Sequence, residues 1–244
     1  MVTGNNRLPV GKISAEVSHL LSTFVKARYL FRSFLISLGF CLLTEGSFAA
    51  PDEELVDIRT IDPRILVELR YSGNRNIAGR ALYPPEMPAL VRSSVARKLI
   101  TAQTFLIEHH YGLKIWDAYR PPDAQAQLWE LSRNTKYVAD PAEGTSLHSW
   151  GVAVDCTLVD EQGREVTMPT DFDTFTPQAM LHYLGPDPTI NYRLYLLRAA
   201  MRQSGFYGMK TEWWHYIVKN WKDFGPVSEV KLSAPAKIDG SMVR

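Results

Sequence analysis

Cysteine is scarce in this sequence. Cys41 and Cys156 are the only two among 244 residues. Two cysteines cannot build a disulfide framework or a cysteine-rich zinc site. Any bound metal must therefore take its ligands from histidine, aspartate or glutamate side chains.

An excess of charge of one sign is also lacking. The chain has 27 basic and 26 acidic residues, which gives a net charge of +1. Without a basic excess we expect no nucleic-acid partner, and the sequence has no acidic block of the kind that forms a disordered tail. The hydrophobic share of 45% and the charged share of 22% are those of an ordinary globular protein.

The apolar run near the N-terminus is too short to cross a membrane. It covers residues 34–43, whereas a bilayer span needs about 20 apolar residues. Three basic residues precede it, and the small residues Ser47 and Ala49 follow it, which is the order found in secretory signal peptides. We predict a signal peptide region over residues 1–49, cleaved near Ala49, and a periplasmic or secreted mature protein without stable membrane insertion. The alternative is a buried N-terminal helix.

The remaining sequence indicates one domain. From Pro51 to about Val227 there is no internal repeat and no linker. We therefore predict a domain over residues 50–227 and a polar C-terminal tail over residues 228–244 that frays.

Hydrophobic spacing within this domain predicts alternating helices and strands. Three- and four-residue spacing predicts a helix over residues 91–106 that Gly112 ends, and another around residues 194–201. A further helix is predicted to begin at Pro121 and Pro122, between the other two in the sequence, since proline is tolerated in a first turn. Strands are predicted at residues 113–116, 151–158 and 213–218, with a turn at 160–163 leading to a partner strand near residue 166. This predicts an α+β fold, an antiparallel sheet with helices packed on it.

Two short motifs carry metal-binding residue types. His148 and Asp155 lie in the segment Ser-Leu-His-Ser-Trp-Gly-Val-Ala-Val-Asp, and Glu212 and His215 lie in Glu-Trp-Trp-His. Two histidines and one aspartate make the three-ligand set of a catalytic zinc, which leaves a fourth position for water. We predict that His148, Asp155 and His215 hold one zinc ion. Glu212 would then reach the water as general base.

Each of these two spacings also occurs by chance, so neither motif alone establishes a metal site. A further candidate is Arg120, in Asp-Ala-Tyr-Arg-Pro-Pro, which could stabilise an oxyanion. It could equally form a salt bridge to Asp117 or Glu130. Cys156 follows Asp155 in an apolar strand, so a buried structural thiol is the favoured interpretation.

Taken together, the motifs resemble the VanX-type D-alanyl-D-alanine dipeptidases of the hedgehog/DD-peptidase zinc superfamily. The resemblance runs from about residue 56 to residue 218. It implies an enzyme that hydrolyses this small dipeptide with zinc, with Glu212 as base and Arg120 at the transition state. It also implies substrate contacts: Tyr71 and Asp173 for the amino end, and Ser146 for the carboxylate.

The sequence departs from the family pattern around the pocket. Trp150 stands where the family often has arginine, Met168-Pro169 replaces a Met-Gly pair, and the stretch over residues 131–145 is shorter. A D,D- or L,D-carboxypeptidase acting on peptidoglycan stem peptides is therefore the alternative function. A non-catalytic zinc-binding wall module is the third.

Overall fold

The computed structural model describes residues 54–84, 86–144 and 146–227. The signal peptide predicted for residues 1–49 and the tail predicted for residues 228–244 lie outside the described residues. Among the helices described, none has the length and hydropathy needed to span a bilayer.

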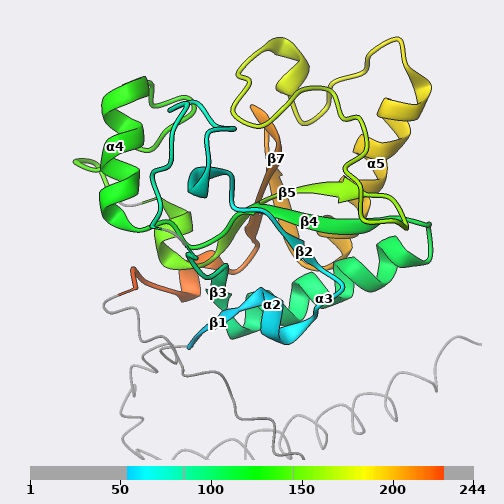
Figure 1. Ribbon diagram of the computed structural model, residues 1–244, viewed down its shortest axis with the longest axis horizontal. Helices are drawn as coiled ribbons and strands as arrows, with labels where there is room; N and C mark the ends of the chain where they lie inside the picture. Colours follow the sequence, from blue (N-terminus) through cyan, green and yellow to red (C-terminus); the bar gives the residue numbers. More distant parts are fainter. Residues whose placement is uncertain (1–53, 85, 145, 228–244) are drawn as a thin grey trace, which may run out of the picture. The chain divides into compact units, whose positions relative to one another are not determined.

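A five-stranded sheet forms the centre of the described unit (Figure 1). Its order is β2 (Leu66–Val67), β4 (Gly112–Asp117), β5 (Ala153–Val159), β7 (Glu212–Val218) and β6 (Phe206–Met209). β4, β5, β7 and β6 pair antiparallel, as the sequence predicts, whereas β2 pairs parallel with β4. The fold is α+β.

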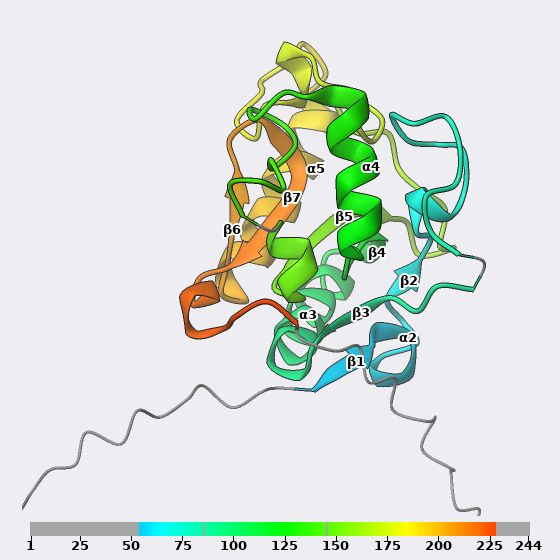
Figure 2. The same cartoon turned by 90° about the vertical axis from the view of Figure 1, so that its left-hand side faces the viewer.

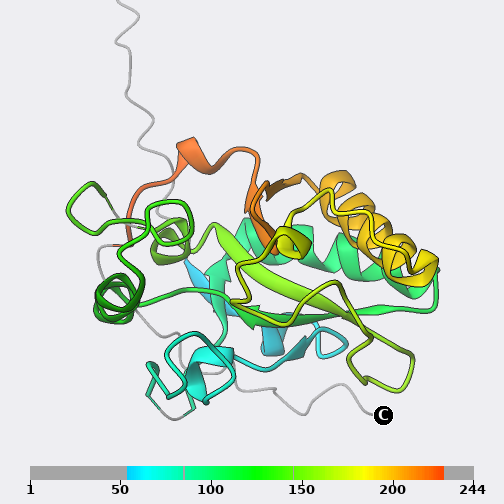
Figure 3. The same ribbon diagram turned by 90° about the horizontal axis from the view of Figure 1, so that it is seen from above.

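Helices α3 (Ser93–Ile107) and α5 (Pro188–Gln203) lie side by side on one face of the sheet (Figure 3). On the other side lie α4 (Pro122–Ser132) and the loop over residues 70–84. This arrangement leaves α3 and α5 to cover the hydrophobic face, while loops surround the opposite face.

A second, two-stranded sheet is separate from the five-stranded one. β1 (Leu55–Asp57) pairs antiparallel with β3 (Leu90–Arg92), and the one-turn helix α2 (Ile58–Ile61) follows β1. Figure 2 shows this pair and α2 below the sheet. Single-turn 3₁₀ helices complete the fold: η1 (Arg70–Ser72), η2 (Leu147–Trp150), η3 (Pro177–Ala179) and η4 (Trp221–Asp223).

Local sequence explains where the main helices begin. Asp187 caps α5, because its carboxylate accepts hydrogen bonds from the Thr189 and Ile190 amides, and Pro188 occupies the first helical position. Proline likewise opens α4. The predicted helix over residues 91–106 begins two residues later than expected, since Val91 lies in β3. That part of the prediction was wrong because the apolar run continues from strand into helix without a change in spacing.

Two further expectations need correction. Gly112 does not end α3; the helix stops at Ile107, a turn with His110 at φ 65° follows, and Gly112 begins β4. The predicted turn at residues 160–163 is present, since the Gly163 amide donates to the Asp160 carbonyl. The partner strand predicted near residue 166 is present only as a single bridge between Val159 and Glu165.

An aromatic cluster lies between the sheet and the loops over the site. The Trp116 and Trp213 ring centroids are 5.6 Å apart, those of Trp213 and Trp214 are 5.5 Å apart, and those of Phe172 and Trp214 are 5.9 Å apart. Both tryptophans of the Glu-Trp-Trp-His motif are fully buried. They fix the strand on which the motif's glutamate and histidine stand.

Candidate metal centre and active site

His148 lies in η2, and the residues at the two ends of this turn set its conformation. The Ser146 hydroxyl accepts a hydrogen bond from the His148 amide at 3.3 Å, which caps the turn. Gly151 ends it with φ 69°, a left-handed conformation that glycine adopts without strain. The backbone of Arg120 is tied to the same turn, because the Ser149 hydroxyl donates to its carbonyl at 2.8 Å.

Asp155 and His215 come together through strand register. They are directly opposite each other on the antiparallel strands β5 and β7. Directly opposed residues project from the same face of a sheet. The two motifs, far apart in the sequence, therefore supply adjacent side chains.

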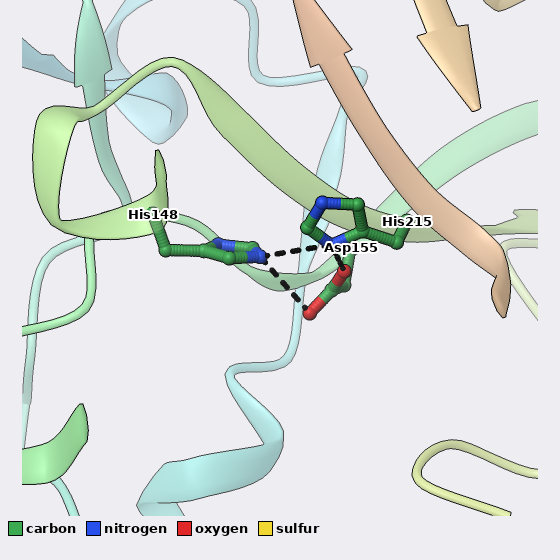
Figure 4. A group of neighbouring side chains, drawn as sticks. All are labelled: His148, Asp155 and His215. Carbon is green, nitrogen blue, oxygen red and sulfur yellow. Dashed lines mark hydrogen bonds and ion pairs between the residues drawn. The ribbon is translucent and has the colours of Figure 1, made fainter. Parts of the chain in front are cut away.

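The three predicted ligands converge on one point (Figure 4). His215 Nδ1 lies 2.9 Å from Asp155 Oδ1 and 3.1 Å from His148 Nε2, and His148 Nε2 lies 3.5 Å from Asp155 Oδ2. All three side chains are buried. Among the described residues, these three form the one group of histidine, cysteine or acidic side chains with metal-binding spacing.

A contact behind the ligand group orients the His148 ring. Its Nδ1 lies 2.8 Å from the Ala118 carbonyl oxygen. A carbonyl can only accept a hydrogen bond, so Nδ1 carries the proton and Nε2 turns its lone pair toward Asp155 and His215. A ligating histidine is prepared in this way when its second nitrogen is fixed by a backbone carbonyl. The donor set therefore fits a metal ion.

Asp155 is ionised within this group. Burial by itself would raise the pKa of its carboxyl, but His148 and His215 outweigh burial and hold the pKa well below its usual range. An ionised carboxylate is the form that ligates a metal.

Arg120 forms one of the salt bridges that the sequence left open, and its guanidinium also lies at the edge of the ligand group. Its Nε and Nη2 donate to Asp117 Oδ2 at 3.0 and 2.7 Å, and its Nη1 donates to Gln125 Oε1 at 2.9 Å. The same Nη2 lies 3.7 Å from Asp155 Oδ2, at the border of the ligand group. The salt bridge to Asp117 is present and it positions the guanidinium beside the site. Glu130 instead pairs with Arg133.

The support for Arg120 includes residues that sequence reasoning missed. Asp117 is fully buried, and besides Arg120 it accepts a hydrogen bond from the Tyr83 hydroxyl. Its Oδ2 also lies 3.5 Å from His148 Nδ1. Gln125 connects the assembly to the loop before the site by donating to the Ala139 carbonyl at 2.7 Å. The motif around Asp117 was visible in the sequence, but nothing pointed to Tyr83 or Gln125.

Glu212 is buried beside the ligands and lacks a partner for one oxygen. Its Oε1 has no hydrogen-bond partner among the described residues. Burial raises the pKa of its carboxyl to about 8; Asp155 and Asp173 add to the rise, and His215 and Arg120 oppose it. A buried acceptor without a partner is costly unless something absent from the chain satisfies it.

Tyr71 and Asp173, the two residues that the resemblance assigns to the substrate's amino end, form a hydrogen bond with each other. The Tyr71 hydroxyl donates to the Asp173 carboxylate at 3.1 Å, and the Ile77 amide donates to Asp173 Oδ2 at 3.0 Å. The Arg120 guanidinium lies 5.0 Å from the centre of the Tyr71 ring. Burial raises the pKa of Asp173 to about 7 despite the Ile77 and Arg120 contacts, which lower it.

A family model described as D-ala-D-ala dipeptidase matches residues 51–223 of the chain. The chain belongs to this family. Its D-alanyl-D-alanine dipeptidase relative from Escherichia coli is 36% identical over 165 residues, which cover 67% of this chain and 83% of the relative. The D-alanyl-D-alanine dipeptidase of Enterococcus faecalis is 30% identical over 194 residues, covering 70% and 91%. A solved LD-carboxypeptidase overlaps more loosely, with a TM-score of 0.39 and 18% identity over 69% of this chain and 71% of that one.

Membership of the dipeptidase family makes the chain a peptidase of a metal-dependent group. The resemblance stated from the sequence motifs is confirmed. The buried Cys156, by contrast, has no place in the site, because it alternates with Asp155 along β5 and so points to the opposite face.

Proposed function

We propose that this peptidase hydrolyses the dipeptide D-alanyl-D-alanine with one zinc ion held by His148, Asp155 and His215. The observation that carries the proposal is the convergence of three ligand atoms beside a buried glutamate and a buried arginine. The substrate is taken from the relatives, which are D-alanyl-D-alanine dipeptidases.

Zinc suits this donor set better than the common hard cations. Two imidazole nitrogens and one carboxylate favour zinc, whereas magnesium and calcium take oxygen ligands. Three protein ligands leave room for water and substrate. When bound, zinc would supply Lewis acidity, which makes water a nucleophile near neutral pH.

Glu212 is the proposed general base. Its Oε1, buried and without a partner in the described chain, is free to accept the proton of the attacking water. Burial favours the neutral carboxyl that forms when this proton is taken up, and the carboxyl can then deliver the proton to the leaving amine. One side chain then serves both halves of the reaction.

Arg120 is proposed to stabilise the oxyanion of the tetrahedral intermediate. Its guanidinium is held from two sides by Asp117 and Gln125, so it needs little reorganisation when negative charge develops. Its planar fork is fixed by hydrogen bonds that a lysine could not reproduce.

The two ends of the dipeptide would meet different residues. Tyr71 and Asp173 are proposed to hold the ammonium group, with Asp173 ionising fully when the cation arrives. Ser146, whose hydroxyl already caps η2, is proposed to contact the carboxylate. A site that pairs both charged ends disfavours longer peptides, because an extended chain leaves a buried polar group unpaired.

Initial rates of the zinc-loaded protein on matched substrates test this proposal. We expect free D-alanyl-D-alanine to be cleaved and its N-acetyl form, the L,D and L,L dipeptides and a stem pentapeptide to be cleaved far more slowly. Asp173→Asn should raise KM for the free dipeptide and leave the slow N-acetyl reaction nearly unchanged. Equal rates on the free and N-acetyl forms would favour a carboxypeptidase. Absence of turnover on every substrate, with zinc bound, would favour a non-catalytic wall module.

We also propose that the protein is exported to a periplasmic or extracellular compartment. The basic, apolar and small-residue order within residues 1–49 supports this. N-terminal sequencing of protein from its native host should give a start at Ala50 or Pro51. An intact N-terminus in a cytosolic fraction would contradict export.

A further inference from the structure

A second cleft lies behind the sheet, away from the metal-binding group. It has a volume of about 460 Å³ and is bordered by α5, the edge strand β6 and the end of β7. We call it the basic cleft, because Arg198, Arg202 and Lys219 line it. The two arginines stand one turn apart on α5, so they lie on the same helix face.

In the part of the chain that the structure describes, no acidic side chain forms an ion pair with these cations. The lining of the basic cleft contains neither aspartate nor glutamate. Within residues 54–84, 86–144 and 146–227, no ion pair involves Arg198, Arg202 or Lys219. Elsewhere on this nearly neutral chain, most described arginines near the surface pair with a carboxylate, as Arg59, Arg64 and Arg164 do. The basic cleft therefore has an uncompensated positive potential that attracts anions.

Backbone contacts hold these cations at the cleft. Arg198 Nη1 donates to the Leu181 carbonyl at 2.9 Å and lies 2.6 Å from His182 Nδ1. Lys219 Nζ donates to the Arg202 carbonyl at 3.3 Å. Two of the three charged groups are thus fixed in place by the fold, which reduces the entropy lost when they bind a ligand.

A buried hydroxyl group at the basic cleft also points to a ligand. Tyr216 lines the basic cleft, is 1% exposed, and its hydroxyl has no hydrogen-bond partner among the described residues. A phenol hydroxyl can donate a hydrogen bond. A buried donor without an acceptor costs free energy that a bound anion would recover.

Aromatic rings form the walls of the cleft. Tyr195 on α5 is 60% exposed and Tyr207 on β6 is 39% exposed, although both are large apolar side chains, and Phe206 is fully buried beneath. Tyrosine rings next to cations suit a ligand that carries a ring as well as a negative charge.

We propose that the basic cleft binds a small ligand that joins an anionic group, phosphate or carboxylate, to a ring. The anion is held by Arg198, Arg202 and Lys219 and accepts a hydrogen bond from Tyr216, while the ring packs between Tyr195 and Tyr207. Tyr216 follows His215 on β7, so the two side chains project from opposite faces of the strand. The basic cleft is therefore separate from the proposed catalytic centre.

Calorimetric titration of the zinc-loaded full-length protein tests this proposal. The probes are phenyl phosphate, hippurate and inorganic phosphate, with neutral benzamide as the uncharged ring. We expect one saturable site for phenyl phosphate or hippurate, weaker binding of inorganic phosphate, and none of benzamide. Whichever of the first two binds more tightly identifies phosphate or carboxylate as the source of the anion. Affinity should fall as salt rises.

Variants locate the site. Arg202→Gln with Lys219→Gln should weaken binding at least about tenfold, since two charge-assisted contacts are lost. Tyr216→Phe should weaken it by a smaller factor. Arg97→Gln removes an exposed helical arginine from α3, outside the cleft, and should bind like the wild type. All three variant proteins should keep the wild-type turnover of dipeptide, which shows that they are folded.

Three results would overturn the proposal. The first is no saturable binding of either charged probe. The second is equal binding by the double variant and the Arg97→Gln control, together with competitive inhibition of dipeptide turnover, which would place the probe at the metal. The third is retention on phosphatidylglycerol vesicles without binding of the soluble probes, which would assign the cations to a lipid surface. Because dipeptide turnover is measured separately, failure here leaves the proposed function unaffected.

Discussion

Glu212 shows how a side chain's surroundings can be more informative than its sequence spacing. The Glu-x-x-His pattern allows the glutamate to be a fourth ligand or a base. In the structure, Glu212 is not part of the converging ligand group, and its Oε1 is buried without a partner in the described chain. That arrangement favours a base that acts on water over a ligand in a closed structural site.

Glu212→Gln is expected to retain zinc and lose most turnover. Glutamine keeps the shape of glutamate but cannot take the proton, and general-base contributions are typically about 10²–10⁴-fold. Zinc content and kcat should be measured on the same sample. Lost zinc would assign Glu212 to the metal instead, and wild-type turnover with full zinc would remove it from the mechanism.

Asp173 predicts a pH dependence of stability. Its pKa of about 7 in the folded protein lies above the value of about 3.9 in an unfolded chain. Between these values the folded protein binds the proton and the unfolded chain has lost it, so this group lowers the free energy of unfolding as pH rises from about 4 to about 7. The loss is complete above about pH 7 and amounts to at most about 4 kcal/mol, because each pKa unit corresponds to about 1.4 kcal/mol.

Urea unfolding of wild type and Asp173→Asn at about pH 4.5 and about pH 8 checks this dependence. The variant should lose less stability than the wild type over that range. Asparagine is the suitable replacement, since Asp173 has φ 55° and asparagine tolerates the left-handed region. An identical change with pH in both proteins would show that Asp173 does not titrate in this window.

At the level of single residues, the candidate ligands came from the chemistry of the motifs, and the structure brings their side chains together. His148, Asp155 and His215 could be chosen because few residue types ligate zinc and the chain has almost no cysteine. Tyr83 and Gln125 could not, because their contribution is a contact across the fold to Asp117 and Arg120. For Arg120, the sequence posed a choice between a salt bridge and an oxyanion contact; the structure shows the salt bridge to Asp117 and places the guanidinium 3.7 Å from Asp155.

At the scale of elements, the turn that carries His148 depends on Gly151. An added Cβ there would lie 2.6 Å from Leu55 Cδ2, and φ is +69°. Gly151→Ala should therefore lower the free energy of unfolding by about 1–2 kcal/mol for the left-handed backbone alone, and weaken zinc binding because His148 moves. Gly73→Ala, where the nearest atom would lie 4.0 Å away, is the matched control. Equal stability and zinc affinity in both variants would contradict this role for the turn.

Long, regularly patterned elements were predictable and short ones were not. The helices α4 and α5 and the strands β4, β5 and β7 match their predicted segments to within a few residues at most ends, with α5 extending beyond its predicted core. β2 has two residues and pairs parallel, β6 follows a helix directly, and β1 and β3 have three residues each. Such short strands owe their existence to partners supplied by the rest of the fold, which a local pattern does not contain.

At the scale of the whole described unit, the central sheet brings the residues of the candidate site together. β4 leads into the segment with Arg120, β5 carries Asp155, and β7 carries Glu212 and His215; the three are neighbours in the sheet. The order β4, β5, β7 cannot be read from the sequence, because α5 and β6 intervene between the last two. The prediction that the two motifs share one metal implies only that the strands carrying Asp155 and His215 lie close together.

The most direct test of the proposed metal site is a zinc titration of the metal-free protein. Metal would be stripped with a chelator and zinc returned in substoichiometric steps while D-alanyl-D-alanine hydrolysis is followed. Turnover should rise in proportion to added zinc and level off at about one zinc per chain, as expected for one open three-ligand site. His148→Ala and His215→Ala should show no such rise. Full turnover by the metal-free protein, or an unchanged titration in both variants, would contradict the assignment of His148, Asp155 and His215 as the catalytic metal site.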